Sequence, residues 1–309
     1  MIIRKKYLYY ILAFASAIIA AGVSALDSAI TKLYIPNPWA LGFACFVVGI
    51  PISLILIALF SISIKGKSFG ARFFDPSFKR IRLFRKEELK YHLLAGAGNA
   101  FLTIGYFALL SILGDPSVVL PFSQIVILYI LIVESITEKN MPTLVEIQSS
   151  LIVTFGAILG SISLTGEINL ISLAIVFLVI NPSWVIFSIY QRKLKLIKIN
   201  GLPNDSLNIR FWNVVFACLI TSLLIPFVDL ILGTTHFREG ISVAITYLPW
   251  VALIMFITFF EFVFYIRALG IGKASVTQAV RASTILFALP FSIILTMLNI
   301  IPPFNLAQP

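Results

Sequence analysis

Long apolar runs alternate with short polar connections along almost the whole chain. An α-helix rises ~1.5 Å per residue, so a run of about 20 apolar residues crosses the ~30 Å hydrocarbon core of a bilayer. A transmembrane β-barrel would instead show segments of about ten residues with alternating hydrophobicity. The pattern therefore predicts an all-α polytopic membrane protein with nine transmembrane helices. We place them at residues 7–30, 39–64, 91–113, 117–135, 144–164, 170–190, 209–232, 247–269 and 275–298.

The composition points to the same class of protein. Of the 309 residues, 60% are hydrophobic and 12% are charged, which leaves too little polar surface to cover a water-soluble core. The two cysteines, Cys45 and Cys218, fall inside apolar runs without a paired framework or the spacing of metal ligands, so we interpret them as packing residues. We expect neither a metal nor another cofactor.

The net charge of +10 is distributed asymmetrically between the two sides of the membrane. On the nine-helix map, the Lys and Arg residues fall on the side of the N-terminus, except for Lys32 and Arg238 on the other side and Arg281 within the membrane. By the positive-inside rule, this distribution places the N-terminus in the cytoplasm. The first apolar run resembles a signal peptide, but it is too long for one and equivalent spans follow it. We therefore expect an integral protein of the cell membrane of a prokaryote.

Two features of the sequence bear on the partners of the protein. The longest polar connection, residues 65–90, contains nine Lys or Arg residues and five interspersed Phe residues. Such a segment can bind RNA, but beside a membrane it more simply lies on anionic headgroups, so we expect membrane lipids and no nucleic acid. Gly156 and Gly160 stand at the GxxxG spacing of closely packed helices, within one chain or between two, and this spacing permits a homodimer.

Two opposite charges lie within adjacent predicted helices. Glu261 precedes the turn at residues 270–272 by about nine residues and Arg281 follows it by about nine, so both lie at a similar depth in the membrane. We predict that the two side chains face each other. A charge inside a membrane marks either a substrate path or a structural ion pair, and both interpretations stay open here. Asp27 falls near the outer end of its span, and we interpret it as interfacial and solvated.

The two halves of the chain show a short internal repeat. The stretch 106–119 parallels 265–277 with a one-residue gap, so that Ser123 corresponds to Arg281. Because the first half holds five predicted spans, an odd number, the second half inserts with the opposite orientation. Inverted repeats of this kind are typical of secondary transporters, whose substrate site lies at the repeat interface.

The stretches around this repeat carry a resemblance to a known family. They are GNAFLTIGYFALLSILGDPSVVLPFSQIVILYILIVESITEKN (98–140) and FFEFVFYIRALGIGKASVTQAVRASTILFALPFSIIL (259–295). They resemble the aromatic-x-x-Ala-Leu segment, the small-residue turn and the membrane-embedded helix of the drug/metabolite transporter superfamily, specifically its EamA-like members. The resemblance implies two inverted five-helix repeats, here residues 1–165 and 166–309, and transport of a small molecule by alternating access.

The sequence departs from the family pattern at two places. The tenth helix, the last of the second repeat, is missing after Pro302 and Pro303, so either the chain is truncated or the fold closes without that helix. Arg281 and Ala282 stand where typical members carry an acid-Pro step. In this respect the chain is similar to the organophosphate branch, the triose-phosphate and nucleotide-sugar translocators, whose basic residues on this helix hold phosphate. The resemblance thus implies an anionic substrate that Arg281 anchors.

Polar and aromatic residues on several predicted helices form the candidate substrate site. An Arg side chain is always charged, and its guanidinium group suits a carboxylate or a phosphate. Glu261 then acts as the switch, because an anionic substrate displaces it or a proton neutralises it as the carrier alternates. Each polar residue serves equally well as an interhelical hydrogen-bond partner. The candidate site residues are Arg281, Glu261, Gln278, Ser123, Gln124, Asn99, Tyr106, Tyr265 and Trp184.

We therefore expect a secondary active transporter, an exporter or exchanger, of a small polar metabolite. One alternative is a membrane scaffold or lipid-interacting protein in which the Glu261–Arg281 pair is only structural. The other is an intramembrane enzyme, but the sequence contains no Walker loop and no metal-spaced His/Cys cluster. His92 and His236 fall on opposite sides of the membrane, so they do not share one site, and an enzyme is not expected.

Overall fold

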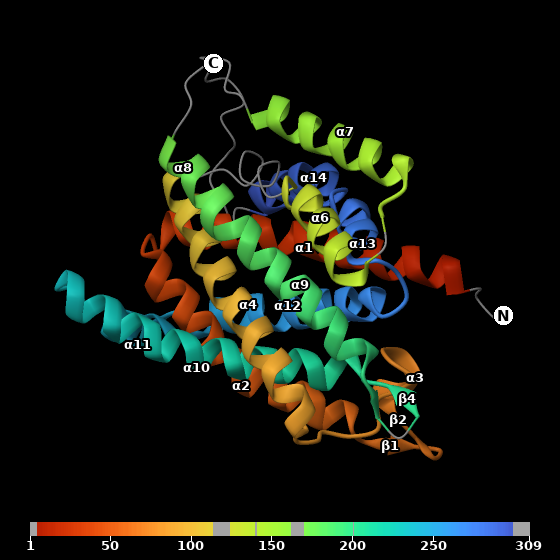
Figure 1. The fold of residues 1–309 in the computed structure, drawn as a ribbon. Coiled ribbons are helices and arrows are strands. Elements are labelled where there is room, and N and C mark those ends of the chain that lie inside the picture. Colours follow the sequence, from red (N-terminus) through yellow and green to blue (C-terminus); the bar gives the residue numbers. More distant parts are fainter. Residues whose placement is uncertain (1–4, 114–123, 140, 162–169, 200, 299–309) are drawn as a thin grey trace.

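Helices make up most of the computed structural model, which describes residues 5–113, 124–139, 141–161, 170–199 and 201–298 (Figure 1). The helices are α1 (Lys5–Leu33), α2 (Pro38–Phe60), α3 (Phe69–Phe73), α4 (Lys86–Leu113), α6 (Val126–Glu138), α7 (Leu144–Ser161), α8 (Leu170–Ala174), the π-helical segment η1 (Ile175–Ile180), α9 (Asn181–Leu196), α10 (Ser206–Leu232), α11 (His236–Thr246), α12 (Leu248–Leu269), α13 (Ala274–Arg281) and α14 (Thr284–Met297). Two antiparallel hairpins pair β1 (Ser63–Ile64) with β2 (Lys67–Ser68) and β3 (Lys198–Ile199) with β4 (Leu202–Pro203).

Seven helical stretches of the described residues are long and apolar enough to cross a membrane. They are α1, α2, α4, the stretch from α8 through η1 to α9, α10, α12, and the stretch from α13 through α14. These stretches fit an all-α polytopic protein integral to a membrane, as the hydropathy pattern predicts. The predicted helices at 117–135 and 144–164 overlap the shorter α6 and α7, and part of each lies outside the described residues. The count of nine therefore stays a prediction.

The structure leaves two further expectations untested. It does not describe the side-chain surroundings of Gly156 and Gly160 on α7, so the homodimer stays a prediction. Pro302 and Pro303 also lie outside the described residues, and with them the expectation about a tenth helix.

Capping residues set where several helices begin and end. Asn37 precedes α2, its side chain accepts hydrogen bonds from N–H groups of the first turn, and Pro38 occupies the first helical position. Asp205 precedes α10 and accepts a hydrogen bond from the backbone N–H of Asn208 at 2.7 Å. α10 ends at Gly233, whose φ of +67° is a left-handed conformation that glycine adopts without steric cost.

The connection between α10 and α12 contains a helix, α11, that the hydropathy pattern does not predict. The carboxylate of Asp229, near the end of α10, accepts hydrogen bonds from the backbone N–H groups of His236 and Phe237 at 2.9 and 2.8 Å. It thereby caps the first turn of α11. α11 lies along α2 and α10 (Figure 1).

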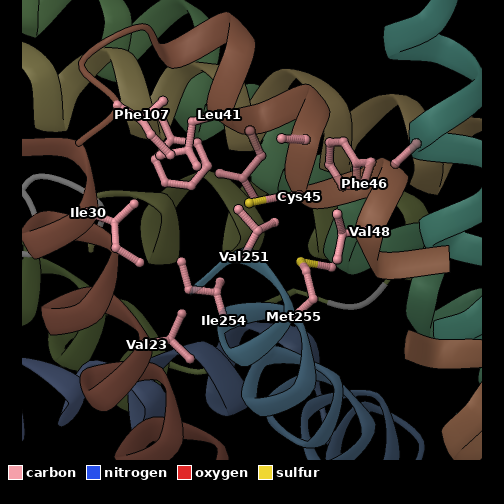
Figure 2. Close-up of a cluster of buried hydrophobic side chains, with 14 of the residues drawn as sticks. Val23, Ile30, Leu41, Cys45, Phe46, Val48, Phe107, Val251, Ile254 and Met255 are labelled. Carbon is pink, nitrogen blue, oxygen red and sulfur yellow. The ribbon is translucent and has the colours of Figure 1, made fainter. Parts of the chain in front are cut away.

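Helices from both predicted halves of the chain pack against one another. α1 packs on α12 and α14, α2 packs on α10, α11 and α12, and α4 packs on α9 and α10. Figure 2 shows part of the apolar cluster between these helices, which includes Val23 and Ile30 of α1, Leu41 and Cys45 of α2, Phe107 of α4, and Val251, Ile254 and Met255 of α12. Both cysteines are buried in this cluster, as predicted for packing residues.

The crossing of α4 and α9 depends on Gly98. A Cβ atom at this position would lie 2.7 Å from the backbone nitrogen of Phe187 and 2.7 Å from the backbone oxygen of Ser183. Any other residue would push the two backbones apart, since real Cβ atoms do not approach other atoms so closely. The crossing holds the next residue, Asn99, at a cavity in the middle of the bundle.

Residues 61–85 and 197–205 fold against each other at one end of the bundle, which we call the basic end. The first segment contains the β1–β2 hairpin and α3, and the second contains the β3–β4 hairpin. Arg267 of α12 donates a hydrogen bond to the backbone oxygen of Phe74, which ties the first segment to the bundle. The long basic connection is therefore folded onto the helices.

Candidate functional site

A cavity lies in the middle of the bundle, and side chains from α1, α2, α4, α9, α10, α12, α13 and α14 line it. We call it the central cavity. It leaves about 130 Å³ for the centres of water-sized molecules. One part of its wall is apolar and includes Val23, Cys45, Phe46 and Met255. The rest carries two acids and two arginines, which is a high density of charge for the interior of a membrane bundle.

Most of the predicted site residues meet at this cavity. Arg281, Glu261, Gln278, Gln124, Asn99, Tyr106 and Trp184 line its wall, although they come from five separate segments of the chain. Tyr265 stands behind this wall, with its ring 4.6 Å from the Arg281 Cζ atom and its hydroxyl 2.7 Å from Ser188 Oγ. Ser123 lies outside the described residues. That these residues bind a substrate stays a prediction.

Glu261 and Arg281 face each other, as their matched depth predicts. Arg281 Nη2 donates a hydrogen bond to Glu261 Oε1, and both side chains are buried. The guanidinium group also lies over aromatic rings, with Cζ 4.6 Å from the centroid of Tyr265 and 5.2 Å from that of Trp184. Such cation–π contacts help to hold the charge away from water.

The pair leaves hydrogen-bonding capacity unused at the cavity. Arg281 Nε and Nη1 are buried and have no hydrogen-bond partner among the described residues. The same holds, within that part of the chain, for Asp27 Oδ1, Gln278 Oε1 and Thr258 Oγ1 in the cavity wall. A buried polar group without a partner costs roughly 1–3 kcal/mol, so this wall is prepared to hydrogen-bond whatever occupies the cavity.

The position of Asp27 corrects the interpretation drawn from the sequence. We interpreted Asp27 as interfacial and solvated, but its side chain is only 5% exposed and lines the central cavity. The physical reason is that α1 continues to Leu33, which carries Asp27 well over a turn inside the helix. A signal was present in the sequence, since Ser24, Asp27 and Thr31 follow helical spacing and share one face of α1.

Arg210 is a cavity residue that the sequence analysis did not identify. The charge map counted it among the basic residues on the N-terminal side of the membrane, but α10 begins at Ser206, and the Arg210 side chain is 1% exposed and lines the cavity. Its Cζ lies 4.4 Å from the centroid of the Phe262 ring. The available signal was an arginine within the first turn of an apolar run.

Some predicted residues also join helices, as the alternative interpretation expected. Asn99 Nδ2 donates a hydrogen bond to Asn213 Oδ1 at 2.8 Å, which links α4 to α10. The Ser188–Tyr265 hydrogen bond links α9 to α12. Asn99 therefore combines a structural contact with a place in the cavity wall, whereas the described contacts of Tyr265 are structural and support the Arg281 guanidinium.

A second set of buried polar residues lies at the basic end, and we call it the basic-end network. Asp75 accepts hydrogen bonds from Lys195 Nζ at 2.5 Å and from Ser206 Oγ and N at 2.6 and 2.8 Å. Glu88 accepts two bonds from the Arg82 guanidinium, at 2.7 and 2.8 Å. Further bonds within the network join Asn204 to Arg82 and Glu88, Asp205 to Asn208, and Lys195 to the backbone of Asn204.

A third polar cluster surrounds Glu134 of α6. Its carboxylate accepts hydrogen bonds from Arg192 Nη1 at 2.6 Å, from the backbone N–H of Ala274 at 2.8 Å and from Ser275 Oγ at 2.6 Å. These bonds connect α6, α9 and the start of α13. Glu134, like the basic-end network, has no part in the wall of the central cavity.

The described residues contain no group of three or more His, Cys, Asp or Glu side chains that could hold a metal ion. No protein-family model matches the chain, and a search of the curated proteins gives no significant match.

Proposed function

We propose that this protein is a secondary active transporter, that it belongs to the drug/metabolite transporter superfamily, and that the central cavity is its substrate site. The observation that carries the proposal is the buried Arg281, which bonds Glu261 and, among the residues that the structure describes, keeps two nitrogen donors without partners at the cavity. Charges at membrane depth are costly, and they commonly mark the path of a substrate or an ion. A purely structural pair has no need of a cavity beside it.

The packing of the helices supports two inverted repeats. Matching α1 with α8–α9, α2 with α10, α4 with α12, and α6 with α13–α14 follows the internal repeat of the sequence. Under this exchange, the contact of α4 with α9 corresponds to that of α12 with α1, and the contact of α4 with α10 corresponds to that of α12 with α2. The contacts of α2 with α10 and of α6 with α13 map onto themselves. Such an arrangement suits nine helices with the N-terminus in the cytoplasm and the site at the repeat interface.

The proposed substrate is a small metabolite with an anionic group. Arg281 and Arg210 both lie at the cavity with Glu261, and guanidinium groups are suited to binding carboxylates and phosphates. An incoming carboxylate or phosphate takes the place of Glu261 beside Arg281, or a proton neutralises Glu261. Either event lets the carrier change between the states that open to the two sides of the membrane. The volume of about 130 Å³ is well below the 300–1,000 Å³ of drug-sized sites, which favours a compact solute over a nucleotide sugar in this conformation.

Thermal unfolding of the purified protein with a panel of ligands tests this proposal. The panel contains succinate, glutamate, glycerol phosphate and the cationic compound tetraphenylphosphonium. A ligand that binds only the native state raises the melting temperature, by the equivalent of about 2.7 kcal/mol at 100 times its dissociation constant. We expect an anion to stabilise the wild type and to lose this effect in Arg281→Ala.

The matched control is Arg192→Ala, which removes a half-buried arginine from an ion pair, with the buried Glu134, away from the central cavity. This variant should unfold at a lower temperature but respond to the same anion as the wild type. If Arg281→Ala keeps the anion response, Arg281 is not the anchor. If no anion stabilises the wild type and Arg281→Ala also fails to fold, the pair is structural, as in a scaffold.

A further inference from the structure

A second pocket lies at the basic end, apart from the central cavity. It leaves about 270 Å³ for the centres of water-sized molecules, against about 130 Å³ in the central cavity, and the two share no lining residue. Its walls come from the end of the 61–85 segment and from the β3–β4 hairpin with the two residues that follow it. We call it the basic pocket because Lys79, Arg80, Arg82 and Arg85 line it.

The positive charges of the Lys and Arg residues in the basic pocket exceed the negative charge of its acidic lining residue. Asp205 is the acidic residue of the lining, and it is buried and already bonded to Asn208 as the cap of α10. Glu88 neutralises Arg82 through two hydrogen bonds. Lys79 and Arg80 are exposed, and neither has an ion-pair partner within the described part of the chain. The pocket therefore presents an excess of positive charge to its contents.

The backbone that carries these charges is held in place. Asn208 Nδ2 donates a hydrogen bond to the backbone oxygen of Arg80 at 3.0 Å, and the backbone N–H of Arg82 donates one to Asn208 Oδ1, also at 3.0 Å. Trp212 Nε1 donates a third bond to the backbone oxygen of Arg82 at 2.9 Å. A fixed scaffold lowers the entropy that a binding site loses when a ligand orders it. A loose run of charged residues lacks this advantage.

An exposed apolar side chain and the predicted sidedness of the chain favour a membrane interface beside the pocket. Leu83 is 78% exposed and lies in the chain between Arg82 and Arg85, which both line the pocket. The charge asymmetry of the sequence assigns this end of the bundle to the cytoplasmic side. Basic pockets on that side of a membrane protein are suited to phosphate groups, which accept several charge-assisted hydrogen bonds at once.

We propose that the basic pocket is a binding site for a phosphate group, contacted by Lys79 and Arg80 and presented either by an anionic lipid or by a soluble phosphate compound. This site is separate from the central cavity and does not depend on the transport proposal. The lipid and the soluble compound use the same chemistry, so the experiment has to separate them.

The test compares two double variants of the full-length protein with equal loss of charge. Lys79→Gln with Arg80→Gln removes two charges from the pocket, and Lys65→Gln with Lys67→Gln removes two from the exposed β1–β2 hairpin outside it. All four residues are exposed, so both variants should fold. One arm titrates inorganic phosphate against chloride at constant ionic strength. The other arm compares phosphatidylcholine nanodiscs with and without phosphatidylglycerol, and both arms follow the melting temperature.

We expect one of the two probes to stabilise the wild type and the pocket variant to bind that probe roughly 30-fold more weakly, since each basic residue contributes several-fold near an anionic group. The hairpin variant should change by less than about threefold, because salt screens distant charges. Stabilisation by phosphatidylglycerol alone assigns the site to a lipid headgroup, and stabilisation by inorganic phosphate assigns it to a soluble compound. The proposal fails if neither probe stabilises the wild type, or if both variants weaken binding equally.

Discussion

The basic-end network and the central cavity each bury an ion pair, but they differ in how completely its atoms are bonded. In the network, Asp75 Oδ2 accepts bonds from Lys195 and Ser206, and Asp75 Oδ1 accepts one from the backbone N–H of Ser77. In the cavity, Arg281 bonds Glu261 through one nitrogen and leaves Nε and Nη1 without partners among the described residues.

This difference separates a structural role from a proposed functional one. A buried ion pair contributes to stability only if further hydrogen bonds satisfy its remaining donors and acceptors, since desolvation otherwise cancels the attraction. Asp75 meets this condition and ties the 61–85 segment to α9 and α10. Arg281 does not meet it, so its residual donors lower the stability of the fold while they suit a ligand. Three predictions test this comparison.

The largest expected effect follows from breaking the satisfied pair. Lys195→Met leaves Asp75 as an uncompensated buried carboxylate, which should lower the free energy of unfolding by about 3–5 kcal/mol. Denaturation of the purified protein, followed by far-ultraviolet circular dichroism, measures this loss. The double variant Asp75→Asn with Lys195→Met removes both charges and should recover most of the stability. A double variant as unstable as Lys195→Met would show that the ion pair is not the cause.

The second prediction uses two carboxylates of the network that respond to pH in opposite directions. Burial acts to raise the pKa of Asp75, but the Lys195 ammonium and the hydrogen bonds from Lys195 and Ser206 outweigh it and leave the pKa below its usual value. Its contribution to stability is therefore present at neutral pH and is lost as the pH falls through that lowered pKa. Burial raises the pKa of Asp205 to about 6, despite the hydrogen bonds from Asn208. Its contribution is present in acid and is lost as the pH rises through about 6.

We therefore expect the melting temperature to rise as the pH falls from about 7 to about 5 and to drop in stronger acid. Each group changes the free energy of unfolding by at most about 1.4 kcal/mol per pH unit. In Asp205→Asn the rise should disappear while the drop in strong acid stays. A rise of equal size in this variant would assign it to another group.

The sequence predicted the features that depend on local pattern. The apolar runs located seven described spans, and the spacing of Glu261 and Arg281 around a turn predicted that they face each other, because helix rise converts sequence distance into depth. Seven of the nine residues named from the sequence line the central cavity, since polar residues within apolar runs are few.

The remaining features depend on contacts between distant segments. Asp75 and Lys195 are 120 residues apart in the chain, and no local pattern pairs them. In the sequence, Arg210 is one more basic residue near the end of a predicted helix. In the structure α10 begins at Ser206, so Arg210 lies within the helix. The basic connection at 65–90 was recognised as charged, but its pocket requires the β3–β4 hairpin, which comes from the other half of the sequence.

The smallest expected change in stability is that of Asp27→Asn in the central cavity. It is compared with Asp75→Asn in the basic-end network. Asp27→Asn replaces a buried carboxyl group whose Oδ1 has no partner among the described residues, so the free energy of unfolding should either fall by less than about 1 kcal/mol or increase. Asp75→Asn, by contrast, places an amide donor among the N–H and O–H donors of Lys195 and Ser206 and should lower the melting temperature clearly. Because the two substitutions change the same atoms, their difference isolates the surroundings of each carboxylate. Equal destabilisation by both would mean that Asp27 is a structural residue, and the contrast between the central cavity and the basic-end network would then not hold.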